Sequence, residues 1–303
     1  MNLSGVGVWS SHLRYRDQSE AAEKAAEVEE LGYSALWIPD VGGPVFESVE
    51  NLLKSTKHIA VATGVLNLWM HPPNDVAARC ASVKSSYADR FLLGIGVSHG
   101  PVVNSVKPGQ YKKPLTATAD YLDGLDNASS PVAVTDRVLA ALGPKMLQLA
   151  AERSAGTHPY LVTPEHTATA RETLGEEALV LPEQTVIVCD GREEARRIGM
   201  EWLQAYQSLP NYVNNFARCG FSREDVSTVT DRFFDAIFAW GEEEAILSRI
   251  NDHRSAGADH VYRPSRLAVS LVTESSIDLV WVRQSVDRGV QVCHVRPVPV
   301  GLG

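Results

Sequence analysis

Short apolar runs alternate with amphipathic helices through the first hundred residues of this chain. The runs, each short enough for a buried strand, are Val6–Trp9, Ala35–Ile38, Ile59–Ala62 and Phe91–Ile95. The helices expected between them cover Asp17–Leu31, Glu47–Lys57 and Pro72–Ala88. Regular alternation of this kind favours a parallel sheet covered by helices and is not typical of a β-sandwich.

The same alternation continues to residue 262, with one long interruption. We expect further strands at Val138–Leu142, Gly156–Val162, Gln184–Val188 and His260–Tyr262. Gly100–Lys113 lacks a helical period and is interpreted as a loop, whereas Glu193–Trp240 exceeds one crossover and predicts an inserted helical hairpin or bundle. Eight strands in 303 residues predict a single (β/α)8 barrel domain with inserted helices before the last strand.

Composition excludes several classes of function. The net charge of −9 argues against general affinity for nucleic acid or for an anionic membrane, and no apolar run reaches the length of a membrane span. Cys80, Cys189, Cys219 and Cys293 form no C-x-x-C pair and have no zinc-like spacing to a histidine, so no metal site is expected. We recognise no signal peptide and expect reduced thiols in a cytoplasmic protein.

The stretch Asp89–Ser98 contains a strand that ends in two glycines, Gly94 and Gly96. Glycine permits a positive φ and lets a ligand approach the backbone without meeting a Cβ. A buried strand opening into such a turn is how α/β folds hold phosphates and planar cofactors. The alternative is a core strand with a glycine-rich exit and no ligand.

Six segments in the right order resemble the luciferase-like monooxygenase superfamily, whose bacterial-luciferase-type barrels use flavin or the deazaflavin F420. They are Leu36–Asp40, Ala62–Asn67, Asp89–Gly96, Ala141–Met146, Gly156–Tyr160 and Ala256–Val261, within a resemblance that runs from Val6 to Tyr262. The middle segments are more similar to the F420-using branch. Sugar-phosphate-oxidising relatives carry a histidine and a glutamate where this chain has Val41 and Val97, so that activity is not expected.

This resemblance implies a cofactor site at the carboxyl ends of the strands. It places a non-prolyl cis peptide at Gly64–Val65, bulging against one face of the cofactor ring. Asn67 would bond the cofactor, the Gly96–Ser98 turn and Gly143 would offer backbone N–H groups to its phosphate, and His158 would contact its tail or pack. The full set of expected cofactor-binding residues is Trp9, Asp40, Gly64, Val65, Asn67, Gly96, Val97, Ser98, Gly143 and His158.

Three residues are candidates for handling protons. In F420-dependent relatives an acidic or histidine residue after strand two contacts the deazaflavin ring, and Asp40 holds that position. A desolvated carboxylate there could carry a raised pKa, although a helix cap or a solvated loop Asp is the alternative. His12 and His99 are candidates by position alone, and each could equally be an ordinary hydrogen-bonded histidine.

The sequence therefore predicts an F420-dependent oxidoreductase that transfers a hydride to or from an unidentified small organic substrate. An FMN-dependent monooxygenase using O2 is the alternative in the same class, and a barrel that binds F420 or flavin without catalysis is the alternative of another class. We also expect a homodimer. Residues 263–303 do not match the superfamily, and we expect them to form an atypical tail that packs poorly on the barrel.

Overall fold

The computed structural model describes residues 3, 5–40 and 42–261, and its main sheet is entirely parallel. The strands follow the order β1-β2-β3-β5-β6-β7-β8, and β4 pairs with β5 beyond the end of β3. Their bounds are β1 (Gly7–Trp9), β2 (Ala35–Ile38), β3 (Ala60–Thr63), β4 (Leu66–Asn67), β5 (Phe91–Gly96), β6 (Arg137–Leu139), β7 (Gly156–Thr157) and β8 (Leu179–Val180).

The sheet closes on itself through the residues that follow the last helix. Asp259 donates its backbone N–H to the Val180 carbonyl at 3.0 Å, and His260 forms a parallel bridge with Gly5, just before β1. These contacts place residues 259–260 between β8 and β1, where the eighth strand of a barrel belongs. The predicted (β/α)8 barrel is thus confirmed, and the expected last strand is confirmed at His260, while Tyr262 lies outside the described residues.

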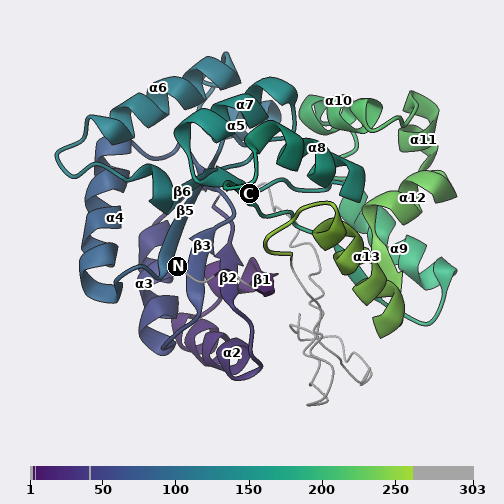
Figure 1. The fold of residues 1–303 in the computed structure, drawn as a ribbon, viewed down its shortest axis with the longest axis horizontal. Helices are drawn as coiled ribbons and strands as arrows, with labels where there is room; N and C mark the ends of the chain where they lie inside the picture. The colour runs from purple at the N-terminus through teal and green to yellow at the C-terminus, as the bar shows by residue number, and fades with distance from the viewer. Residues whose placement is uncertain (1–2, 4, 41, 262–303) are drawn as a thin grey trace.

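Helices cover the outside of the barrel, and the inserted group lies beside it (Figure 1). The bounds of the barrel helices are α1 (His12–Tyr15), α2 (Gln18–Glu30), α3 (Val45–Ser55), α4 (Pro73–Tyr87), α5 (Gly100–Val106), α6 (Pro114–Asp126), the 3₁₀ turn η1 (Val134–Asp136), α7 (Pro144–Arg153), α8 (Pro164–Leu174) and α13 (Glu243–Ser255). The insertion holds α9 (Arg192–Leu203), α10 (Pro210–Arg218), α11 (Arg223–Thr228) and α12 (Asp231–Ile237), which confirms the predicted helical insertion.

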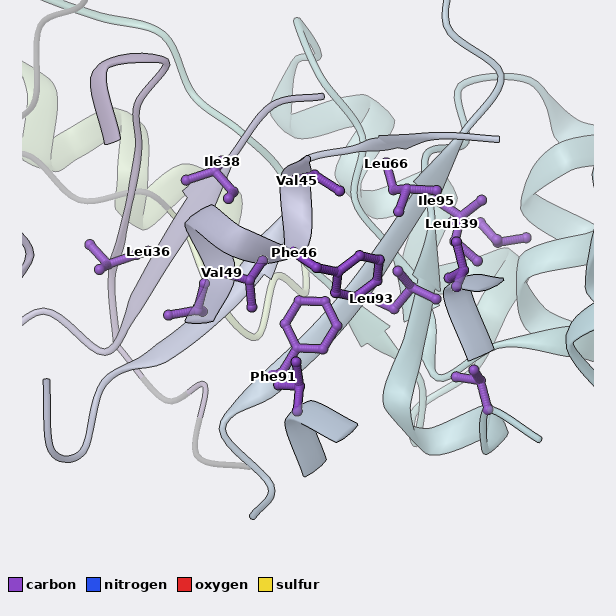
Figure 2. Packing of buried hydrophobic residues seen from close by; sticks show 14 of the residues in the cluster. Leu36, Ile38, Val45, Phe46, Val49, Leu66, Phe91, Leu93, Ile95 and Leu139 are labelled. Atoms are coloured by element: carbon purple, nitrogen blue, oxygen red, sulfur yellow. The ribbon is translucent and has the colours of Figure 1, made fainter. Parts of the chain in front are cut away.

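Both faces of the strands are buried, which explains why they read as continuous apolar runs. Alternate residues such as Leu36 and Leu93 point outward to the helices, where Phe46 of α3 meets Phe91 of β5 edge to face at 5.8 Å (Figure 2). The other residues fill the barrel interior around Trp37, which is fully buried. The hydrophobic effect on both faces therefore orders the barrel wall.

Gly94 shows why β5 needs glycine in its middle. A Cβ at this position would lie 2.0 Å from the Thr63 carbonyl oxygen, and the Thr63 hydroxyl bonds both the N–H and the carbonyl of Gly94. The close approach lets β5 follow β3 up to the point where residues 64–65 leave the sheet. This role is structural and does not require a ligand.

Three sequence predictions about individual elements were wrong. Strand seven is β8 at Leu179–Val180, whereas residues 186–188 form β9 (Val186–Val188), which pairs with β10 (Ala239–Gly241) outside the main sheet. Both are short apolar runs near Pro182, and periodicity alone cannot separate them. The expected loop at 100–113 begins with helix α5, in which Pro101 occupies the first turn, where proline is tolerated. Only Val103 of this helix is buried, so the sequence shows no apolar helical period there. Strand six ends at Thr157 and does not reach Val162.

The expectations for the tail, residues 263–303, and for Cys293 lie outside the described residues. Within the described part of the chain no helix is long and apolar enough to cross a membrane. In the same part no three His, Cys, Asp or Glu side chains gather in a way that could hold a metal ion.

Candidate functional site

Hydrogen bonds tie together, in pairs, the carboxyl ends of neighbouring strands that carry residues predicted to form the site. Trp9, after β1, donates its indole N–H to the Gly64 carbonyl at 2.7 Å. Trp69 donates its indole N–H to the Val97 carbonyl at 2.8 Å, linking the segment after β4 to the end of β5. The peptide between Gly64 and Val65 is cis, as the family resemblance implied.

Asp40 is more thoroughly engaged than the sequence suggested. Its side chain is fully buried; Oδ1 accepts from the Gly42 N–H at 2.8 Å, and Oδ2 accepts from the Asn67 N–H at 3.1 Å. Oδ2 also lies 2.8 Å from Nε2 of His71, and the Arg14 guanidinium is 4.0 Å from Oδ1. The carboxylate therefore ties the segment after β2 to β4, and His71 and Arg14 are partners that the sequence did not reveal.

Asn67 is a buried polar side chain of the site whose amide has a donor that is unpartnered within the described residues. Its exposed fraction is 1%, and its Oδ1 accepts from the Trp69 N–H at 3.2 Å. No acceptor among the described residues lies within hydrogen-bond distance of Nδ2. A buried donor without a partner costs about 1–3 kcal/mol, so this amide fits a ligand acceptor.

Gly96 and Gly143, both expected to offer N–H groups to a phosphate, lie in different surroundings. A Cβ at Gly96 would lie 2.5 Å from Cγ2 of Val65, so glycine there makes room for the Gly64–Val65 segment. Gly143 caps the N-terminus of α7, and a Cβ there would lie 3.4 Å from a guanidinium nitrogen of Arg218 on α10. Only Gly143 combines a helix N-terminus with a nearby positive charge.

The three predicted histidines lie in separate environments. His12 is buried in α1, and its backbone N–H is bonded to the Ser10 hydroxyl. His99 caps α5 and packs on Tyr212 with ring centroids 5.4 Å apart. Burial lowers the pKa of His99, and a side-chain hydrogen bond with Asn211 partly offsets this by raising it. His12 is therefore the first residue of α1, whereas His99 contacts Tyr212 of the inserted helix α10.

His158 fills the barrel interior. Its ring stacks on Trp37 at 4.3 Å, its Nδ1 bonds the Leu181 carbonyl at 2.7 Å, and burial lowers its pKa to about 4. A Cβ at Gly64 would lie 3.0 Å from its Nε2, so His158 lies directly beneath the Gly64–Val65 segment. Of the two roles expected for it, packing is the one its surroundings match.

Sequence reasoning missed a cluster of tyrosines and one carboxyl group at the same end of the barrel. We call Tyr160, Tyr206 and Tyr212 the tyrosine cluster; their ring centroids lie 5.3–6.2 Å apart. Glu183, buried beside them, has its pKa raised by burial to about 8. Assigning strand seven to residues 184–188 had placed Glu183 before a strand, whereas it follows β8 at the carboxyl end.

The comparisons with known proteins agree with this geometry. Residues 4–137 match the family model of the luciferase-like monooxygenases. A Mycobacterium tuberculosis protein provisionally named a coenzyme F420-dependent oxidoreductase is 25% identical over 206 residues, covering 56% of this chain and 58% of that protein. The chain thus spans less than two thirds of that curated relative.

Solved structures share the fold at low identity. They include an F420-dependent secondary alcohol dehydrogenase bound to an F420–acetone adduct (TM-score 0.64, 15% identity, covering 86% of this chain and 93% of that one). The F420-dependent tetrahydromethanopterin reductase of Methanopyrus kandleri gives 0.66 at 16% identity with the same coverage. An FMN-bound type II Baeyer–Villiger monooxygenase component from Pseudomonas putida gives 0.62 at 15% identity, covering 86% and 91% of the two chains. The resemblance to the luciferase-like superfamily is confirmed.

Proposed function

Since residues 4–137 match the family model of the luciferase-like monooxygenases, we propose that this chain is an oxidoreductase that binds F420 and transfers a hydride between this cofactor and a small organic substrate. The proposal places the cofactor at the carboxyl ends of the strands, where barrel enzymes hold their ligands. FMN in the same position is the second candidate, because an FMN-bound barrel is among the similar structures.

The observation that carries the proposal is the Asn67 amide. Its Nδ2 is buried without an acceptor among the described residues, and Gly64, Val65 and Val97, which follow the ends of β3 and β5, are only partly buried. A planar ring with carbonyl and ring-nitrogen acceptors, which deazaflavin and flavin share, would satisfy that donor. The Asp40 carboxylate accepts the backbone N–H of Asn67 and holds that residue in place, so in this proposal Asp40 orients the Asn67 side-chain amide.

The phosphate of either cofactor would lie at the N-terminus of α7. Pro144, the first residue of this helix, has no N–H, and the N–H groups of Met146 and Leu147 bond the Gly143 carbonyl, so the N–H groups of Gly143 and Lys145 would meet the phosphate. The Arg218 guanidinium approaches the same glycine. Asn215, whose exposed fraction is 1%, accepts a hydrogen bond from Arg218 at 3.2 Å and orients it. A helix N-terminus with an arginine beside it favours an anion both by its dipole and by charge-assisted hydrogen bonds.

When bound, F420 supplies the hydride acceptor or donor, and the chain supplies binding and orientation. Asn67 would bond the ring, Trp9 would hold the Gly64 carbonyl in position, and Arg218 with the α7 N-terminus would fix the phosphate. Val97 and Trp69, joined by their hydrogen bond, would close the site on the β5 side.

Titration of the purified protein with F420 and with FMN, followed by cofactor fluorescence, tests the proposal. We expect F420 to bind more tightly than FMN and its fluorescence to change on binding. The Asn67→Asp variant, which replaces the donor by an acceptor, should lower the affinity for F420 about 10- to 100-fold. The matched control is Asn51→Asp on α3, because that amide bonds only the Gln18 carbonyl on the outside of the barrel.

Three results would change the conclusion. Binding of neither cofactor would refute the proposal, and tighter binding of FMN would replace F420 by flavin. An Asn67→Asp variant that binds F420 as tightly as the control would remove Asn67 from the site.

A further inference from the structure

Glu183 lies at the carboxyl end of the barrel without a cationic partner. It follows β8 by three residues, and its backbone N–H donates to the Pro159 carbonyl at 2.9 Å, beyond the end of β7. Its exposed fraction is 9%. Among the ion pairs of the described residues none includes Glu183. Buried carboxylates are normally paired, so an unpaired one indicates a carboxyl group that carries its proton.

The groups around this carboxyl are hydroxyls and a backbone amide. The Thr185 hydroxyl lies 3.1 and 3.2 Å from Oε1 and Oε2, and the backbone N–H of Leu161 bonds the carboxylate. The tyrosine cluster faces it from the β7 side and from the insertion; burial raises the pKa of each of these phenols, and the charge of Glu183 adds to that rise. Burial is the main reason that the pKa of Glu183 rises to about 8, and the bonds from Thr185 and Leu161 oppose it.

Hydroxyl groups and aromatic contacts lead from Glu183 towards the proposed cofactor position. The Tyr160 hydroxyl donates to the Tyr206 hydroxyl at 3.4 Å, and both side chains are only partly buried. The Tyr160 ring lies 6.4 Å from the ring of Trp9, whose indole N–H bonds the Gly64 carbonyl. The charge of Glu183 acts on both tyrosine hydroxyls, and the Tyr160 ring lies beside Trp9, so Glu183, the two hydroxyls and the Gly64–Val65 segment lie at the same end of the barrel.

We propose that Glu183 is the proton carrier of this site and exchanges a proton with the substrate through the hydroxyls of Tyr160 and Tyr206. This inference rests on the proposed function. In the reducing direction a carbonyl carbon gains a hydride from the reduced cofactor, and the carbonyl oxygen takes a proton that Glu183 releases through the hydroxyls. The Glu183 carboxylate then regains a proton from water, and in the oxidising direction each transfer is reversed. The substrates that fit are alcohols and carbonyl compounds, in which a C–H and an O–H bond form or break together.

This assignment gives the proton-carrying role to Glu183 in place of Asp40, which was the first candidate from the sequence. Both Asp40 oxygens already accept backbone N–H groups, and one also contacts His71, so the carboxylate is committed to holding its loops. Glu183 instead contacts the Thr185 hydroxyl, and the hydroxyls of Tyr160 and Tyr206, which can either donate or accept, are close enough for its charge to raise their pKa values. A hydroxyl that can reverse its hydrogen bond is what a proton relay requires.

Infrared spectroscopy of the full chain tests the proposal directly. We expect a protonated-carboxyl band that titrates with a midpoint near pH 8, that Glu183→Gln removes, and that the matched variant Glu176→Gln on the exposed surface retains. Thr185→Val should raise the midpoint by about half a pH unit or more, because it removes a hydroxyl that stabilises the carboxylate. Adding F420 should also raise the midpoint, since the bound anion opposes ionisation of a group at the site.

The outcomes distinguish this proposal from the proposed function. If no band between pH 6 and 9 disappears in Glu183→Gln, the proton carrier is refuted whatever the protein binds. If the band titrates but bound F420 leaves its midpoint unchanged, Glu183 is a structural acid away from the site and the proposal is also refuted. If F420 does not bind while FMN does, the proposed cofactor fails, and the same shift measured with FMN decides the role of Glu183. If neither binds, the proposed function fails, and because the inference rests on it the proton-carrier role falls with it.

Discussion

Glu183 makes the stability of this protein depend on pH in a way that a single variant can isolate. Burial raises its pKa from 4.5 to about 8 in the folded state. The unfolded chain therefore loses this proton at a lower pH than the folded chain does. Ionisation consequently favours the unfolded state as pH rises from 4.5 to about 8, and the penalty is constant above that range. Glu183→Gln keeps the shape and the neutral charge of the protonated acid and lacks this penalty.

The size of the effect follows from the same two pKa values. At about 1.4 kcal/mol for each pH unit, the difference between 4.5 and about 8 gives an upper bound of about 5 kcal/mol. Part of the penalty is already present at pH 5, and water that enters around the charged form reduces it further, so we expect Glu183→Gln to gain about 2–4 kcal/mol relative to wild type between pH 5 and pH 8.5. Urea unfolding of both proteins at pH 5, 7 and 8.5, followed by far-UV circular dichroism, measures this difference.

A flat difference would refute the reasoning. If Glu183→Gln and wild type differ in unfolding free energy by the same amount at all three pH values, then Glu183 ionises alike in the folded and unfolded states. The exposed variant Glu176→Gln serves as the control and should show no comparable pH dependence. Parallel slopes against urea concentration are needed for the comparison, because they show that the same surface is exposed on unfolding.

Three further substitutions test contacts in and near the site. Asp40→Asn turns one of the two carboxylate oxygens into an NH2 group, so that either the Gly42 N–H or the Asn67 N–H loses its acceptor. We expect F420 affinity to fall at least about tenfold in a fluorescence titration. Gly96→Ala places a Cβ 2.5 Å from Val65, and we expect a loss of about 1–3 kcal/mol in urea unfolding together with weaker F420 binding. Glu29→Gln removes a carboxylate that accepts three backbone N–H groups ahead of β3, and we expect a loss of about 1–3 kcal/mol at pH 7.

Each of these expectations has its own contrary result, and Gly96→Ala also has a matched control. Gly191→Ala is the control for Gly96, because nothing lies within 4 Å of the Cβ it adds, and equal stability of the two variants would contradict the predicted clash. Asp40→Asn with unchanged F420 affinity and a hundredfold lower turnover would return Asp40 to the proton-handling role. For Glu29, burial raises the pKa but the backbone N–H groups outweigh it, so the stabilisation exists above pH 4.5 and disappears as pH falls through the lowered pKa. A stability difference for Glu29→Gln that stays constant down to pH 3 would contradict this.

The first half of the barrel was predictable because its strands are buried on both faces. Leu36 and Trp37 are apolar whichever way they point, and the run they form stands out between amphipathic helices. Strand seven was not predictable, since residues 179–180 and 186–188 are equally short and apolar. Residues 186–188 are kept out of the barrel because they pair with β10, which leaves residues 179–180 to join it. That pairing joins segments more than 50 residues apart in the chain.

Sequence by itself determined the resemblance to the luciferase-like superfamily, the order of the early strands and the positions of Asp40, Asn67 and the Gly64–Val65 segment, because these follow local motifs at the ends of buried strands. Only the tertiary structure decided what those groups do. It placed the N–H of Asn67 against Asp40 and left the Asn67 amide without an acceptor among the described residues. It also buried Glu183 among tyrosines that come from the insertion and from the end of β7. A pKa and an unmet hydrogen bond depend on which distant groups surround a side chain, and no local pattern in the chain records that neighbourhood.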